Sequence, residues 1–78
     1  MNIEKEIKGI ISEIVGIAED KIDTKASFQD DYGLDSLRAL EILAAVENKF
    51  GIVIDPEKLS EMVNVDNVVR IAKEYINV

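Results

Sequence analysis

The amino-acid sequence predicts an all-α fold, a small four-helix bundle in which a long loop joins helices 1 and 2 and helix 3 is short. Apolar residues recur at helical spacing in separate segments, and Gly or Pro stands near the expected helix ends. The apolar run Ile52–Ile54 is isolated, and a single strand has nothing to pair with. The chain has 78 residues, so we expect one domain that spans residues 1–78.

The first helix is expected from Asn2 to about Val15. Asn2 is a suitable N-cap residue, and Gly16 is suitable to end the helix. Isoleucines recur every three or four residues and form one apolar stripe, which consists of Ile3, Ile7, Ile10, Ile11 and Ile14.

A loop is expected from Ile17 to Asp35, because the helical spacing of apolar residues fails there. Ile22 and Phe28 are isolated apolar residues that we expect to anchor this loop to the core. The loop contains six acidic and two basic residues, so it holds four of the seven net negative charges. Loops of this length in small domains are usually functional or disordered.

The second helix is expected over Ser36–Phe50, which is rich in Leu, Ala and Glu and is followed by Gly51. Six side chains are expected to face the core: Ala39, Leu40, Ile42, Leu43, Val46 and Phe50. The opposite side presents Leu37, Glu41, Ala44 and Asn48, flanked by Arg38 and Ala45. This side is less polar than the outer face of an ordinary surface helix, so it is a candidate partner surface.

Two shorter helices are expected after residue 54. Asp55 as N-cap and Pro56 at the first helical position begin a brief third helix, with Leu59, Met62 and Val63 as its apolar residues. Asn64 is the expected cap of a fourth helix that runs to about Ile76. Its inward residues are expected to be Val65, Val68, Val69, Ala72, Tyr75 and Ile76.

Composition excludes several classes of function. The chain has no Cys and no His, which excludes disulfides, Cys/His zinc sites and catalysis through its own thiol or imidazole. A net charge of −7 argues against nucleic-acid binding and favours partners with basic patches. The acidic loop lacks the residue spacing of an EF-hand, so no metal site is expected. With no visible secretory segment and no apolar run of about 20 residues, we expect a cytoplasmic protein without a membrane span.

The segment Asp31–Leu37 carries the main functional signal. It places Ser36 at the start of the strongest helix, where free backbone amides and the positive end of the helix dipole favour a phosphate group. A phosphodiester on Ser36 would lie in that field. Serine is also a common N-cap residue, so on spacing alone an ordinary structural cap is the alternative.

From about Phe28 to Ile76 the chain resembles the acyl carrier protein family, whose members carry acyl groups on a 4′-phosphopantetheine arm. The matching residues are Asp31, Gly33, Asp35-Ser36-Leu37, Glu41, Glu47-Asn48-Lys49-Phe50-Gly51 and the segment 65–76. The order of helices and the long loop match the family fold over the whole length. The resemblance implies a monomeric carrier of thioesters that is not itself an enzyme.

The resemblance also implies roles for individual residues. Ser36 matches the serine that receives the arm from coenzyme A, in a reaction of a separate, Mg²⁺-using phosphopantetheinyl transferase. Asp35 and Leu37 match its neighbours in the cofactor site. Residues expected to bind partners are Asp31, Arg38, Glu41, Ala44, Glu47 and Asn48. The other expected partners are enzymes with basic patches that load and transfer acyl groups.

The second helix departs from the pattern of carriers in fatty acid synthesis, which is usually acidic. It holds two acidic and two basic residues, with Arg38 and Asn48 at positions where acidic residues are common and Ala44 where a larger apolar residue is common. Fatty acid or other lipid biosynthesis and a specialised acyl-transfer pathway both remain open, as do polyketide, nonribosomal peptide and D-alanyl transfer. The alternative from another class is a cofactor-free helical module that binds proteins through Leu37, Ala44 and Ala45.

Overall fold

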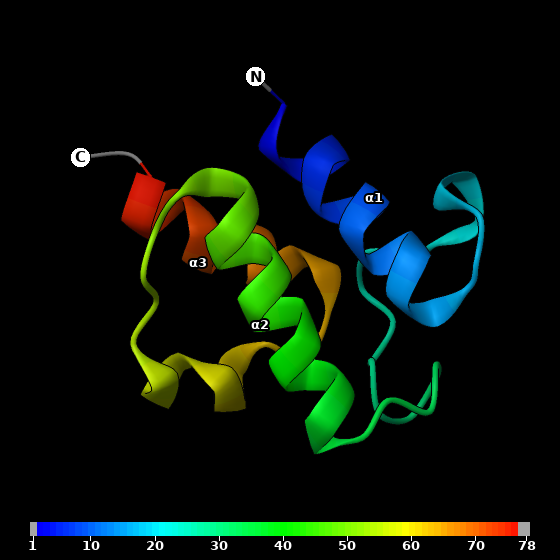
Figure 1. Cartoon of the computed structure of the whole chain (residues 1–78). Coiled ribbons are helices and arrows are strands. Elements are labelled where there is room, and N and C mark those ends of the chain that lie inside the picture. Colours follow the sequence, from blue (N-terminus) through cyan, green and yellow to red (C-terminus); the bar gives the residue numbers. More distant parts are fainter. Residues whose placement is uncertain (1, 77–78) are drawn as a thin grey trace.

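A computed structural model describes residues 2–76, and Figure 1 shows how its helices are arranged. In chain order they are helix α1 (Ile3–Val15), the 3-10 helix η1 (Glu19–Lys21), helix α2 (Ser36–Phe50), the 3-10 helix η2 (Pro56–Glu61) and helix α3 (Val65–Ile76). Residues 2–76 contain no strand, and Ile52–Ile54 lie in the segment without regular secondary structure between α2 and η2. The all-α prediction and the order of helices are confirmed, with η2 in the place of the short third helix.

The helix ends follow from the capping residues that the sequence predicts. Asn2 Oδ1 accepts a hydrogen bond from Lys5 N at 3.1 Å at the start of α1, and Asn64 Oδ1 accepts one from Asn67 N at 2.8 Å at the start of α3. Gly16 and Gly51 end α1 and α2 with φ angles of 76° and 65°. Since residues with a Cβ rarely adopt this left-handed conformation, glycine is suited to both positions.

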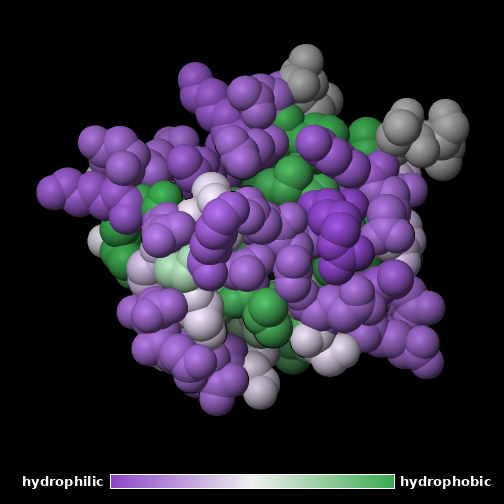
Figure 2. All heavy atoms as spheres, turned by 180° about the vertical axis from the view of Figure 1, so that it is seen from behind, coloured by the Kyte–Doolittle hydropathy of each residue, from purple (hydrophilic) through white to green (hydrophobic). Residues whose placement is uncertain are grey.

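The core lies where α1 packs against both α2 and α3, and η2 contacts α2 and α3 (Figure 1). Its fully buried large side chains come from these helices and from the segment before η2: Ile7, Ile11, Ile42, Val46, Ile54, Val65, Val68 and Ile71. Figure 2 shows the face behind Figure 1, on which polar side chains predominate and apolar atoms are visible in separate areas. None of the helices described within residues 2–76 has the length and hydropathy needed to cross a bilayer.

Three side chains differ from their predicted placement. Leu40 is predicted to face the core but is 48% exposed, and Val63, predicted as an apolar residue of the third helix, lies after the end of η2 and is 47% exposed. Leu40 lies about 120° around α2 from the buried Val46, outside the stripe of roughly 100° that a helix turns toward its core. Ile71 was absent from the predicted core and is fully buried, because α3 has both α1 and η2 as neighbours.

The long loop is attached to the bundle by apolar anchors and by backbone hydrogen bonds. Ile22 and Phe28 are buried, which confirms them as anchors. Phe28 N donates to Val63 O at 2.8 Å, and Asp66 N donates to Thr24 O at 3.0 Å. The loop therefore runs alongside the segment that joins η2 to α3 and the first turn of α3, more than 30 residues away in the sequence.

The 3-10 helix η2 is held mainly by its ends. Asp55 Oδ1 accepts a hydrogen bond from Glu57 N at 2.9 Å and Pro56 follows, so the predicted cap is confirmed. Asp55 N donates in turn to the Tyr75 hydroxyl of α3 at 3.1 Å. None of the six residues of η2 is fully buried. This helix thus lies on the surface, beside the first turns of α2 (Figure 1).

Candidate functional site

Ser36 is the first residue of α2 and is exposed. The residue before it, Asp35, is the N-cap, and its Oδ1 accepts a hydrogen bond from Arg38 N at 3.0 Å. The interpretation of Ser36 as an ordinary structural cap is therefore wrong, because Asp35 performs that function. Ser36 lies at the start of the helix, where backbone amides have no partner within the helix, and its hydroxyl does not cap the helix.

The preceding loop fixes the position of Ser36. Leu34 is buried, and its N donates to Phe28 O at 2.9 Å. Asp31 Oδ2 accepts a hydrogen bond from Ser27 N at 2.7 Å, which closes the turn between them. Gly33 has a φ of 64°, so the chain reverses there before it enters α2. In Figure 1 this start of α2 lies at the lower end of the molecule, far from the start of α1.

An open groove with a volume of about 880 Å³ lies between the loop and η2, and Ser36 is one of the residues that line it. Its apolar lining is formed by Phe28, Leu34, Ala39, Pro56, Leu59, Met62 and Val63. Polar residues also line it, namely Ser27, Gln29, Asp35, Glu57 and Ser60. Since Phe28, Leu34 and Met62 are buried, the groove lies on top of the core and not within it.

Sequence reasoning did not identify this groove. Ala39 is predicted only as a core residue and Leu59 and Val63 only as apolar residues of the third helix, and the position of the latter two beside Ser36 depends on how η2 packs against α2. The hydrogen bond from Phe28 N to Val63 O joins the two walls. No local sequence signal indicates a backbone contact between residues so far apart in the chain.

The predicted partner-binding residues lie on the exposed surface, with one exception. Asp31, Arg38, Glu41, Ala44 and Asn48 are exposed. Glu47 is half-buried, and its Oε2 accepts a hydrogen bond from Ile54 N at 2.8 Å. This carboxylate thus holds the segment that leads from α2 to η2.

The charged groups of α2 are engaged within the molecule. Arg38 Nη1 lies 3.5 Å from Glu41 Oε2 and donates to Ile14 O, in the last turn of α1, at 3.4 Å. Lys49 Nζ lies 3.0 Å from Glu6 Oε2 of α1. Both cations of α2 therefore have neighbours at α1.

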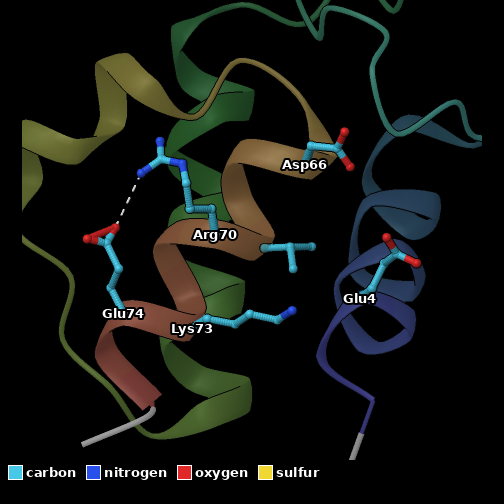
Figure 3. Close-up of a pocket in the computed structure, with 6 residues that line it drawn as sticks. Glu4, Asp66, Arg70, Lys73 and Glu74 are labelled. Atoms are coloured by element: carbon cyan, nitrogen blue, oxygen red, sulfur yellow. Dashed lines mark hydrogen bonds and ion pairs between the residues drawn. The ribbon is translucent and has the colours of Figure 1, made fainter.

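A second hollow lies between α1 and α3 and has no residue in common with the groove (Figure 3). Its volume is about 600 Å³, and its lining mixes acidic and basic groups: Glu4, Asp66, Val69, Arg70, Lys73 and Glu74. Arg70 Nη1 pairs with Glu74 Oε1 at 3.4 Å. The lining holds three acidic and two basic groups, so neither sign of charge dominates this hollow. In residues 2–76 there is also no group of three acidic residues placed to hold a metal ion.

The arrangement at Ser36 thus combines an exposed hydroxyl with an apolar groove. Such a hydroxyl can be esterified, and the groove can hold a chain attached to it. The residues present therefore fit a covalently attached group with a flexible arm, because the attachment atom is accessible and the adjoining surface is hollowed.

Two comparisons with known proteins agree with this site. The family model described as "Phosphopantetheine attachment site" matches residues 5–72. A solved structure titled "The ishigamide ketosynthase/chain length factor" contains a similar chain with 28% sequence identity and a TM-score of 0.77. That similarity covers 96% of this chain and 94% of the other.

Proposed function

Because this chain belongs to the family of phosphopantetheine-binding acyl carrier proteins, whose cofactor is covalently attached 4′-phosphopantetheine, we propose that Ser36 is the attachment residue. The observation that carries this assignment is the exposed hydroxyl of Ser36 beside Asp35, which caps α2 in its place. When bound, the cofactor supplies a terminal thiol that forms thioesters with acyl groups. The chain itself, which has no Cys, supplies no thiol.

The chain's own residues present the attachment atom and hold it in place. Asp35 fixes the first turn of α2 through its bond to Arg38 N, and Leu34 and Phe28 anchor the segment before it. The Ser36 hydroxyl would accept the phosphopantetheine group of coenzyme A in the active site of a phosphopantetheinyl transferase. Domains of this family are generally carriers without catalytic activity.

The groove is the surface that we assign to the arm and the first part of an acyl chain. Ser36 lines it, and it combines apolar residues with polar groups that suit the amides of the arm. The core beneath it is filled by side chains such as Ile42, Val46 and Ile54. The acyl chain would therefore lie along the surface of the protein and stay accessible to partner enzymes.

The pathway that we favour is chain extension of the polyketide type. The solved structure with the similar chain is named for a ketosynthase and a chain length factor, and the similarity extends over nearly the whole of both chains. The neutral balance of charges on α2 is a second argument, because it departs from the acidic helix of carriers in fatty acid synthesis. Fatty acid synthesis is the second candidate, since the same arm and groove would serve it.

Intact mass spectrometry tests the proposal. Wild type and Ser36→Ala would each be incubated with coenzyme A and a broad-specificity phosphopantetheinyl transferase. We expect the wild type to gain the mass of one phosphopantetheine group and the folded variant to gain none. A folded wild type that gains no mass would instead support a cofactor-free interaction module. Incubation of the modified protein with ketosynthase/chain length factor enzymes then tests the pathway, with an extended thioester as the expected product.

A further inference from the structure

The 3-10 helix η2 forms one wall of the groove beside Ser36. Four of its six residues line the groove, namely Pro56, Glu57, Leu59 and Ser60. Leu59 is half-buried against the core, and none of the six is buried, whereas Ile54 before the helix and Met62 after it are buried. Burial therefore fixes the two flanks of this wall, and polar contacts with other elements hold the helix between them.

Glu61, the last residue of η2, contacts two side chains of α3. Asn67 Nδ2 donates a hydrogen bond to Glu61 O at 2.8 Å, and Arg70 Nη2 lies 3.3 Å from Glu61 Oε1. We call Glu61, Asn67 and Arg70 the η2 clamp. Because α3 contacts both the backbone and the carboxylate of Glu61, the η2 clamp restrains this end of η2 relative to α3.

The opposite end of the segment is held by contacts that precede η2. The Tyr75 hydroxyl of α3 accepts a hydrogen bond from Asp55 N at 3.1 Å. Glu47 Oε2 of α2 accepts one from Ile54 N at 2.8 Å. Both contacts act on residues before η2, whereas the η2 clamp acts on η2 itself.

The residues of the η2 clamp also have partners within their own elements. Arg70 Nη1 pairs with Glu74 Oε1 within α3 at 3.4 Å (Figure 3), and Glu61 Oε2 pairs with Lys58 Nζ within η2 at 3.8 Å. These two pairs do not join η2 to α3. Ion pairs between exposed side chains are weak, so we expect the hydrogen bond from Asn67 to contribute most to the η2 clamp.

We propose that Asn67 and Arg70 are positioning residues of the carrier site, which act from α3 by holding η2 in the place where it forms the wall of the groove. This inference rests on the proposed function, since it takes the groove as the place of the arm. Neither residue is among those that line the groove. Release of Glu61 frees one end of the wall, and such a local opening does not require the rest of the bundle to unfold. A thioester on the arm is then more accessible to reagents in water.

Two measurements on the full chain test the proposal, and both use the variants Asn67→Ala and Arg70→Gln. The matched control is Glu74→Gln, which removes the partner that Arg70 has within α3 and leaves the η2 clamp in place. Asn67→Ala keeps the backbone hydrogen bond from residue 67 to Asn64 Oδ1, so the cap of α3 is unaffected.

The first measurement is amide hydrogen exchange by NMR on the unmodified chain. Lys58 N and Met62 N report on η2, because they donate to Asp55 O at 2.9 Å and to Leu59 O at 3.1 Å. Amides of α1 report on unfolding of the whole bundle. The second measurement starts with transfer of octanoyl-phosphopantetheine from octanoyl-CoA by a phosphopantetheinyl transferase. Hydroxylamine then cleaves the octanoyl thioester, and intact mass follows the loss of the octanoyl group.

We expect exchange at Lys58 N and Met62 N to become about three- to tenfold faster in Asn67→Ala and about twofold faster in Arg70→Gln. The amides of α1 should exchange as in the wild type, and Glu74→Gln should match the wild type throughout. Cleavage of the thioester should accelerate in the same order of variants, because hydroxylamine reaches the groove more easily when η2 is released.

The proposal is overturned if Asn67→Ala exchanges like Glu74→Gln, or if the amides of α1 accelerate as much as those of η2. It is also overturned if η2 exchanges faster while the octanoyl group is cleaved at the wild-type rate, because the η2 clamp would then have no role toward the arm. If Asn67→Ala does not fold, Arg70→Gln decides by the same comparisons. A folded wild type that is never modified removes the proposed function and this inference with it, whereas a modified chain with unaffected variants removes this inference alone.

Discussion

Substitution of Asp35 and Ser36 one at a time separates the structural role of this pair from its chemical role. Asp35 caps α2, so Asp35→Ala leaves Arg38 N without its acceptor at 3.0 Å. Loss of an N-cap costs about 1 kcal/mol, within a range of roughly 0.5–2 kcal/mol. In a domain of this size each 1 kcal/mol changes the Tm by about 4–8 °C. We expect Asp35→Ala to lower the Tm by an amount in that range.

Ser36→Ala should behave differently. Ser36 is exposed at the first helical position and does not cap the helix, and Ala favours a helix more than Ser by a few tenths, ~0.5 kcal/mol. The free energy of unfolding should therefore stay the same or rise slightly. Asp35→Asn is the matched control, since Asn caps as well as Asp and the substitution removes only the charge.

Thermal and urea unfolding followed by circular dichroism measure all three variants. The expected order of Tm has Ser36→Ala and Asp35→Asn near the wild type and Asp35→Ala below them. A Ser36→Ala variant that loses as much stability as Asp35→Ala would refute the assignment of Asp35 as the cap. The serine hydroxyl would then have a structural role that accounts for its position without a cofactor.

Three further substitutions test the packing by the same unfolding measurements. Gly9→Ala should raise the free energy of unfolding by about 0.5–1 kcal/mol, because Gly weakens a helix interior. The added Cβ would meet the Glu19 side chain at 3.7 Å, an ordinary contact distance, so a destabilised variant would show that this space is not free. Glu47→Ala should lower it by about 1–3 kcal/mol, because Ile54 N loses its acceptor, while Glu47→Gln should lose less; equal losses would contradict that hydrogen bond. Ile71→Ala should cost about 2–5 kcal/mol as a cavity in the core, and a loss below 1 kcal/mol would contradict its complete burial.

The helix ends were predictable because their determinants are local. Asn2, Gly16, Gly51 and Asn64 act through hydrogen bonds or a backbone conformation within a few residues of themselves. The same holds for Asp55, which begins η2. A sequence pattern contains all the information that such contacts need.

The groove and the exposure of Leu40 were not predictable in this way. Both depend on where η2 and the long loop pack against α2, and that packing joins Phe28 to Val63 through the backbone. Periodicity placed Leu40 within a broad apolar arc, but α2 turns only part of that arc toward α1. Whether a residue near the edge of such an arc is buried or exposed depends on tertiary contacts.

The cap of α2 depends both on local chemistry and on the geometry of the loop before it. Both residue types are good caps and they are adjacent, so composition alone left the role of Ser36 open. The backbone at Gly33 and Leu34 sets the point at which the helix begins, and it places Asp35 in the capping position. The sequence offered Ser36 as a structural cap, and the loop geometry gives the capping position to Asp35 instead.

The most direct test of the account is to locate the modified residue by tandem mass spectrometry, after the wild-type chain has been treated with coenzyme A and a phosphopantetheinyl transferase. The chain supplies its own controls, because Ser12, Ser27 and Ser60 offer other hydroxyls to the same enzyme. The account predicts that the phosphopantetheine group is on the peptide that contains Ser36 and on that residue alone. Modification at another serine, or a folded chain that stays unmodified, would contradict it.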